Sequence, residues 1–258
     1  MKKVIYIGGS GKLATYIEKS TNYIVSKRNK THPYYLDLND LENSILINEK
    51  KCLFVIGAAI SEPTRCENNP DLCIKINYLK TSELIDKLLQ ENKVLFLSSD
   101  LVFEGNDMTL PNYENSKTNP NHLYSKLKVD IEEKFKDHKN FYICRLSYIL
   151  FKENSFTNYL NSCSVEQQTP EIIHPLIRHA TAPKEIIKYI ELIKKGDREI
   201  PQIKHISGKA LSRVDMYLKW QDENKVHNDY KTIHISETQM KNYPDYINFD
   251  SNYNYNNK

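Results

Sequence analysis

The sequence predicts an α/β protein built on a doubly wound parallel sheet. Short apolar runs at residues 4–7, 52–56 and 94–97 read as buried strands, and the first is followed at once by a glycine-rich turn. Stretches with helical periodicity separate the runs. Strands that alternate with helices form parallel sheets with right-handed crossovers. We therefore expect a Rossmann-type doubly wound parallel sheet.

The first element is the strand at residues 4–7 with the turn behind it. Gly8, Gly11 and Ala14 follow at intervals of three, and a helix is predicted from about Lys12. Gly8 permits a tight turn, Gly11 lets a phosphate approach the backbone, and the small Ala14 lets helix and strand pack closely. The helix N-terminus offers unpaired N–H groups and partial positive charge. This context favours a dinucleotide site over an ordinary turn.

The second strand is expected at residues 23–25 and ends in polar residues. Ser26, Lys27 and Arg28 stand where many dinucleotide folds carry an acid that binds the adenosine ribose. A hydroxyl and two cations suit a phosphate on that ribose, which favours NADP over NAD; an ordinary charged loop is nearly as good an explanation. Asp37 follows a third expected strand, and we expect it near the adenine.

Another buried strand, at residues 52–56, leads to Ala58 and Ala59, whose small side chains leave room for a cofactor. Residues 72–90 then have helical periodicity, and the polar Asn77 lies beside the apolar face. The alternation of strand and helix therefore continues through the middle of the chain.

The strand at residues 94–97 ends in polar residues, among them Ser99 and Asp100. Ligands of parallel α/β sheets bind at the carboxyl ends of the strands. Gly8, Ala58 and Ser99 all follow strand ends, so they should share one edge of the sheet. Asp100 either caps a turn or takes part in the chemistry.

Tyr124 and Lys128 are four residues apart at the start of a helix predicted over residues 123–135, so their side chains share a face. The Tyr-x-x-x-Lys spacing occurs four times, but only here does it combine a helix start with a serine at a preceding strand end. An ammonium beside a tyrosine lowers the phenol pKa from about 10. The phenol then serves as an acid or base near neutrality, while Ser99 can hydrogen-bond a carbonyl oxygen.

These motifs resemble those of extended short-chain dehydrogenases/reductases, in the sugar-nucleotide epimerase/dehydratase/reductase group, and are most similar to the dTDP-4-dehydrorhamnose reductase type. The resemblance covers about the first 150 residues. The segments that carry it are Gly8-Gly9-Ser10-Gly11-Lys12-Leu13-Ala14, Ala58-Ala59, Asn77, Leu97-Ser98-Ser99-Asp100-Leu101-Val102-Phe103-Glu104-Gly105 and Tyr124-Ser125-Lys126-Leu127-Lys128. The resemblance implies Ser99, Tyr124 and Lys128 as the catalytic set.

The resemblance also implies cofactor contacts at the pyrophosphate and the nicotinamide ribose. Together with the residues after the second strand, the candidate cofactor-binding residues are Gly8, Gly11, Lys12, Leu13, Ser26, Lys27, Arg28, Asp37, Ala58, Ala59 and Asn77. The candidate substrate-binding residues are Asp100, His174 and Arg178, the last two facing a diphosphate. The alternative for His174 is a loop or core histidine. We expect a cofactor domain over residues 1–150, and over residues 151–258 the remaining sheet and helix elements with a small substrate cap. Since the chain is shorter than the members it resembles, the resemblance implies that this C-terminal substrate-binding portion is reduced.

Composition limits the partners. The 258 residues include 36 Lys and Arg against 33 Asp and Glu, for a net charge of +3, which predicts neither a nucleic-acid nor a membrane partner. No apolar run is long enough to span a bilayer. The cysteines lack metal-ligand spacing, which predicts no metal site and reduced thiols in a cytoplasmic protein. They are Cys52, Cys66, Cys73, Cys144 and Cys163.

The combined expectation is an NADP-dependent oxidoreductase that reduces a keto group of a nucleotide-activated (dTDP- or GDP-) deoxysugar or heptose. Tyr124 would donate the proton and Ser99 would polarise the oxygen. NAD stays open as the cofactor. The alternatives are an epimerase or dehydratase that retains its cofactor, and a non-catalytic NADP-binding regulatory subunit. A homodimer is left open, and the resemblance implies a role in making a surface polysaccharide.

Overall fold

The computed structural model describes residues 3–103, 111–151, 153–174, 176–196 and 199–234, so Glu104 and Gly105 lie outside the described residues. Its centre is a six-stranded sheet with the order β2-β1-β3-β4-β5-β8, and every neighbouring pair is parallel. The expected parallel sheet is therefore confirmed. Its strands are β1 (Val4–Ile7), β2 (Ile24–Val25), β3 (Leu53–Ile56), β4 (Lys93–Ser99), β5 (Phe141–Leu146) and β8 (Ile203–Ile206).

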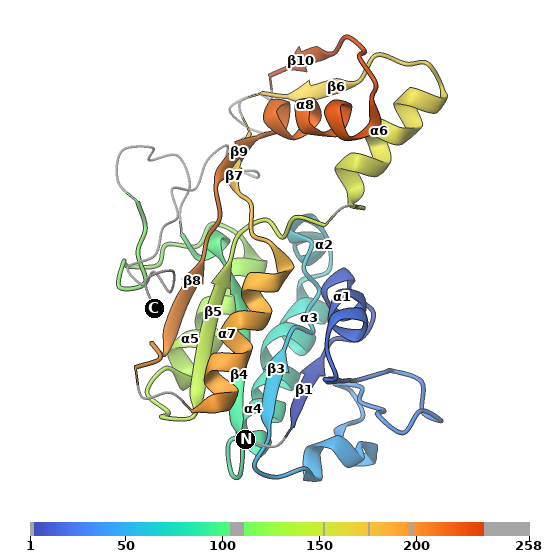
Figure 1. Cartoon of the computed structure of the whole chain (residues 1–258). Helices are drawn as coiled ribbons and strands as arrows, with labels where there is room; N and C mark the ends of the chain where they lie inside the picture. Colours follow the sequence, from blue (N-terminus) through green and yellow to red (C-terminus); the bar gives the residue numbers. More distant parts are fainter. Residues whose placement is uncertain (1–2, 104–110, 152, 175, 197–198, 235–258) are drawn as a thin grey trace.

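Helices cover both faces of the sheet (Figure 1). On one face α4 (Thr81–Leu88) and α5 (Leu123–Phe135) pack against the strands, and on the other face α1 (Lys12–Ser20) and α7 (Pro183–Lys195) do so. Strands buried on both faces need apolar residues at successive positions, which is why their sequences read as continuous apolar runs. The order of the strands reverses between β1 and β3, and this switch point is where ligands of such sheets bind.

The strand expected before Asp37 is reduced to a single bridge between Lys27 and Tyr35. The preceding residues form turns, with Tyr35 N–H donating to the His32 carbonyl at 3.0 Å, so their backbone groups are not free for a longer ladder. Two short 3₁₀ helices follow. They are η1 (Leu41–Asn43) and η2 (Ile45–Asn48).

The single helix expected over residues 72–90 is divided. It begins in α3 (Pro70–Cys73), widens into the π-helix η3 (Ile74–Lys80), and ends as α4; the short α2 (Pro63–Asn68) precedes it. Wide turns of this kind are frequent at functional sites. Asn77 lies inside the wide turn and is buried.

A small lobe lies beyond the carboxyl edge of the sheet (Figure 1). It consists of α6 (Ser155–Val165), β6 (Glu171–Ile173), α8 (Arg213–Asn224) and β10 (Lys231–Ile233), and the antiparallel pair β7 (Ile177–His179) and β9 (Ala210–Ser212) joins it to the sheet. The lobe has its own core, in which Trp220 packs. Within the described ranges, the structure has no helix of the length and apolarity needed to cross a bilayer.

Candidate active site

The glycine turn is held tightly between the ends of β2 and β3. Gly8 has a φ of +131°, and a Cβ there would lie 2.9 Å from the backbone nitrogen of Ala58. A Cβ at Gly9 would lie 1.8 Å from the Ser26 carbonyl oxygen, a constraint that the sequence reasoning missed. A Cβ at Gly11, by contrast, would meet only the Gly8 carbonyl oxygen, at an ordinary contact distance of 3.7 Å; Gly11 precedes α1, which no described side chain caps. This turn therefore fits a phosphate at the N-terminus of α1.

The polar residues after β2 have different surroundings. Ser26 is 2% exposed, and its hydroxyl accepts a hydrogen bond from Gly8 N–H at 3.2 Å, so it supports the turn. Lys27 pairs with Glu18 of α1, and Arg28 is exposed. Of these three residues, Arg28 is thus the most open to a ligand.

Three further cofactor candidates are placed by local contacts. Lys12 Nζ donates to the Glu153 carbonyl at 3.1 Å, which ties the start of α1 to the segment entering the small lobe. Leu13 is buried against the sheet. Asp37 accepts a hydrogen bond from Asn39 N–H at 2.8 Å, which closes a local turn.

Asn77 organises the loop after β3. Its amide oxygen accepts from Ile60 N–H at 2.8 Å, and its amide nitrogen donates to the Ile60 carbonyl at 2.9 Å. This pair of bonds holds the segment that follows Ala58 and Ala59. Asn77 is buried, so it acts on this edge through the loop that it holds.

Ser99 and Asp100 form a hydroxyl–carboxylate cluster where β4 ends. Ser99 Oγ accepts from Leu101 N–H at 3.2 Å, starting η4 (Asp100–Val102), and donates to Asp100 Oδ1 at 3.1 Å. Ser147, which follows β5, donates to Asp100 Oδ2 at 2.5 Å. Burial raises the pKa of Asp100, while the charge of Arg178 and the two hydroxyls oppose that rise. The cluster thus brings Arg178 of β7 to the edge of the sheet.

Tyr124 and Lys128 lie on one buried face of α5, as their spacing predicts. Lys128 Nζ donates to the Leu97 carbonyl at 2.8 Å and lies 5.6 Å from the centre of the Tyr124 ring. The bond fixes α5 to β4 two residues before Ser99. Leu101 of η4 packs against the apolar cluster that contains Tyr124, so the hydroxyl cluster and the phenol lie at the same edge of the sheet.

Burial dominates the electrostatics of this pair. It raises the pKa of Tyr124, and the Asp100 carboxylate adds to the rise. Burial also lowers the pKa of Lys128 to about 8. The expected lowering of the Tyr124 pKa by a neighbouring ammonium is therefore wrong in this structure. Lys128 faces the Leu97 carbonyl and the Phe96 ring, 4.4 Å from its centre, and desolvation of the phenol outweighs its charge.

His174 lies away from this cluster, in the small lobe. It is exposed, its N–H donates to the Ile233 carbonyl at 2.9 Å, and its ring stands 5.9 Å from that of His234. In the described part of the chain, no group of three or more His, Cys, Asp or Glu side chains could hold a metal ion.

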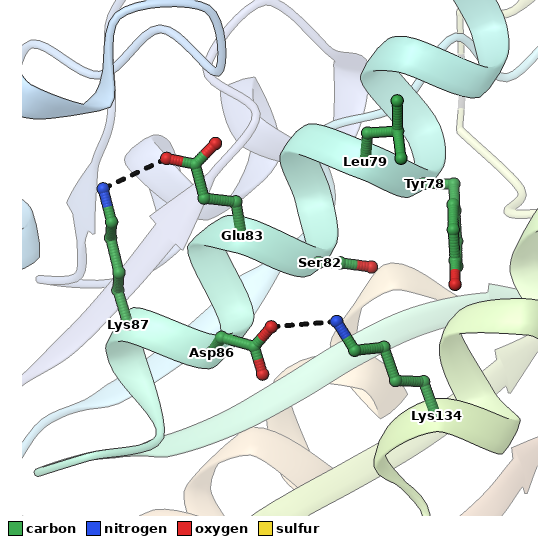
Figure 2. Close-up of a pocket in the computed structure, with 7 residues that line it drawn as sticks. All are labelled: Tyr78, Leu79, Ser82, Glu83, Asp86, Lys87 and Lys134. Atoms are coloured by element: carbon green, nitrogen blue, oxygen red, sulfur yellow. Dashed lines mark hydrogen bonds and ion pairs between the residues drawn. The ribbon is translucent and has the colours of Figure 1, made fainter.

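A pocket of about 460 Å³ is lined by residues of η3, α4 and α5 (Figure 2). Lys134 of α5 pairs with Asp86 at 2.8 Å across it, and Lys87 pairs with Glu83 at 3.1 Å on its rim. None of the predicted site residues lines it. Lys134 is ten residues beyond Tyr124, about 15 Å along the helix, so this pocket is separate from the candidate site.

The fold and the carboxyl-edge site define a Rossmann-type α/β protein with a serine at the end of β4 and a tyrosine and a lysine on the helix α5 that packs beside it. More specifically, the chain belongs to the family described as the RmlD substrate binding domain, whose model matches residues 1–248. Among curated proteins, none matches the sequence.

Several solved structures share this fold. The dTDP-4-dehydrorhamnose reductase of Bacillus anthracis, in complex with NADP, superposes with a TM-score of 0.79 at 18% identity, over 91% of this chain and 85% of that one. The reductase of the same name from Yersinia enterocolitica gives 0.77 at 21% identity, over 98% and 91%. The UDP-glucose 4-epimerase of Thermotoga maritima, with UDP-glucose, gives 0.71 at 13% identity, over 91% and 86%. Reductases and epimerases therefore both have this fold.

Proposed function

We propose that this protein is an NADP-dependent reductase of a keto group on a nucleotide-activated sugar, of the extended short-chain dehydrogenase/reductase type. Membership of the RmlD substrate binding domain family supports the substrate class. The observation that carries the proposal is the buried phenol of Tyr124 beside Lys128, on the helix that is bonded to β4 two residues before Ser99. A phenol can donate its proton to the oxygen of a reduced carbonyl, and an ammonium beside it favours the phenolate that remains.

The cofactor would lie across the switch point. The N–H groups at the start of α1 would hold its pyrophosphate beside Gly11, and Arg28 would face the ribose phosphate that distinguishes NADP. Ala58 and Ala59 would border the nicotinamide ribose. When bound, the cofactor supplies the hydride; the protein positions it and manages the proton. An NADP complex of a B. anthracis protein with this fold supports the choice of NADP over NAD.

The proton and the carbonyl oxygen are handled by the three residues on β4 and α5. Tyr124 donates its proton to the oxygen of the reduced carbonyl. Ser99, whose hydroxyl donates to Asp100 in the structure, turns that hydrogen to the same oxygen and so polarises it. The Lys128 ammonium stabilises the phenolate left behind, because opposite charges attract strongly in a buried site.

The substrate would reach this edge from the side of the small lobe. Arg178, near the Asp100 carboxylate, would meet the diphosphate of a dTDP- or GDP-sugar, and Asp100 would hydrogen-bond the sugar. His174 would contribute only from the lobe. This division assigns the cofactor to residues 1–150 and the sugar nucleotide to the cap within residues 151–258.

The test is oxidation of NADPH across a panel of nucleotide keto-sugars, with Tyr124→Phe as the variant. Loss of a general acid is expected to lower kcat by about 10²- to 10⁴-fold. Tyr113→Phe is the matched control, because Tyr113 begins the same Tyr-x-x-x-Lys spacing in a polar loop. Equal turnover by Tyr124→Phe and the parent would remove the phenol from the mechanism.

The second candidate is an epimerase or dehydratase that retains its cofactor, and it is favoured by the fold shared with UDP-glucose 4-epimerase. Such an enzyme would purify with a tightly held dinucleotide and need no added NADPH. Binding of NADPH with no turnover of any sugar would instead support a regulatory subunit.

A further inference from the structure

Two cysteine thiols lie next to each other in the apolar cluster that packs against Tyr124, here called the wall of the site. Cys66 of α2 and Cys73 at the end of α3 are both fully buried, and their Sγ atoms are 2.8 Å apart. Both pack in one apolar cluster with Tyr124 and Leu127. Nothing in the assigned chemistry uses them.

We propose that Cys66 and Cys73 form an oxidation site: a dithiol that a peroxide converts to a disulfide in the folded protein, lowering turnover at Tyr124. A disulfide needs the two sulfurs about 2.05 Å apart. They have to approach by only about 0.8 Å from their present separation. The remaining cysteines lie on other elements, at the start of β3, within β5 and within α6. They are Cys52, Cys144 and Cys163.

The oxidation balances with hydrogen peroxide as the oxidant. The Cys66 thiolate attacks one peroxide oxygen, the O–O bond breaks, and a sulfenic acid and hydroxide form. The Cys73 sulfur then attacks the sulfenic sulfur, the S–S bond forms and the S–O bond breaks. Two thiols and one peroxide thus give one disulfide and two waters. A dithiol reductant reverses the step by exchange through a mixed disulfide.

Access to the buried pair comes from the elements that carry it. Helix α2 has only six residues, while α3 is the first turn of the helix that continues into η3 and α4; both begin with a proline, Pro63 and Pro70. A helix as short as α2 has little stability of its own, so it opens locally at small cost and exposes Cys66. Burial raises the pKa of Cys66 to about 12, so the resting form is the thiol and oxidation proceeds only through that opening.

The bond would disturb the wall of the site. In the thiol form, Cys66 Sγ–H donates to the Ile60 carbonyl at 3.4 Å and accepts weakly from the Asn77 amide at 3.8 Å. A disulfide has no S–H, so the first contact is lost. The loop after Ala59 and the Tyr124 ring share this wall, and small displacements at a reacting group lower the rate severalfold. This consequence for turnover rests on the proposed reductase function.

The experiment treats the full chain with hydrogen peroxide under native conditions and then maps disulfides by mass spectrometry after alkylation. We expect one peptide pair linking Cys66 to Cys73, a mass lower by two hydrogen atoms, and a severalfold loss of turnover that dithiothreitol restores. Cys73→Ser should prevent the link and the peroxide-dependent loss, and Cys73→Ala serves if the serine is poorly tolerated. Cys163→Ser is the matched control and should behave like the parent.

A folded protein that forms no such link, or links other cysteines, would overturn the site. A link that leaves turnover unchanged would overturn its effect on the reaction. The mass readout requires no substrate, so a reversible link in a chain that turns over no keto-sugar would support the oxidation site while the proposed function fails.

Discussion

The sheet and the small lobe differ in the contacts that stabilise each of them. In the sheet, β4 pairs with β5 over six positions, and helices bury both faces. In the lobe, β6 and β10 pair over three positions, joining segments that are 60 residues apart around Tyr217 and Trp220. The lobe helix α8 depends on a local cap as well, since Ser212 Oγ accepts from Asp215 N–H at 3.0 Å.

This difference leads us to expect that the sheet holds the cofactor edge in place, while the lobe tolerates changes in its contacts. The cofactor turn and the catalytic candidates lie on strands and helices of the larger core, where a small displacement is costly. The lobe is smaller and lies beyond the carboxyl edge of the sheet, so we expect substitutions in its core to leave the cofactor edge unchanged. The predictions below test that separation, from the largest expected effect to the smallest.

Breaking the buried ion pair between α5 and β5 should have the largest effect on the free energy of unfolding. Arg145 Nη2 lies 2.6 Å from Glu132 Oε2, with both side chains at most 5% exposed. Glu132→Ala leaves the guanidinium buried without its carboxylate and should lower the free energy of unfolding by about 3–5 kcal/mol, measured in urea. Glu133→Ala, which removes only a surface pair with Lys136, is the control, with a loss below about 1 kcal/mol. Similar losses in both variants would contradict this account.

Removing the lobe's tryptophan tests whether the lobe is separable. Trp220→Ala should lower the free energy of unfolding by about 3 kcal/mol, because a large buried ring is lost. NADPH binding should stay unchanged, since no cofactor candidate lies in that core. Fluorescence titration with NADPH measures it, with exposed Lys219→Ala as the control. A large loss of NADPH affinity would mean that the lobe and the cofactor edge are one unit.

A methyl group in the glycine turn should weaken NADPH binding, whereas a methyl group at a glycine outside the turn should not. Gly8→Ala forces alanine into a φ of +131° and against Ala58, so we expect an affinity lower by about 10- to 100-fold. Gly196→Ala is matched in having a positive φ, at +80°, but has no atom within 4 Å of the added methyl. It should leave NADPH affinity intact. Equal affinities in the two variants would argue against phosphate binding at this turn.

The pH dependence of turnover should follow Lys128. Its pKa of about 8 means that the ammonium is present below pH 8 and is lost as the pH rises through that value. Turnover should therefore fall above pH 8, approaching tenfold per pH unit, while the raised pKa of Tyr124 keeps the phenol protonated. In Lys128→Arg the fall should move to higher pH, because arginine stays charged. A profile that is flat from pH 7 to 10 would exclude a required ammonium.

Local patterns in the sequence determined the sheet, the glycine turn and the face shared by Tyr124 and Lys128. A strand buried on both faces must be apolar at successive positions, so the apolar runs at Val4–Ile7 and Leu53–Ile56 predict these strands directly. A turn that needs φ of +131° requires glycine, and a spacing of four on a helix brings two side chains to one face.

Only the tertiary structure decided the environment of those residues. Asn77 in the π-helix makes two hydrogen bonds to Ile60, a residue 17 positions away. The thiols of Cys66 and Cys73 meet because α2 packs against the start of the helix that α3 begins. The pKa of Tyr124 depends on how much water the fold removes from the phenol, and desolvation outweighed the ammonium four residues along. These hydrogen bonds, side-chain contacts and pKa shifts arise from contacts between segments that are distant in the sequence, so a local sequence pattern cannot predict them.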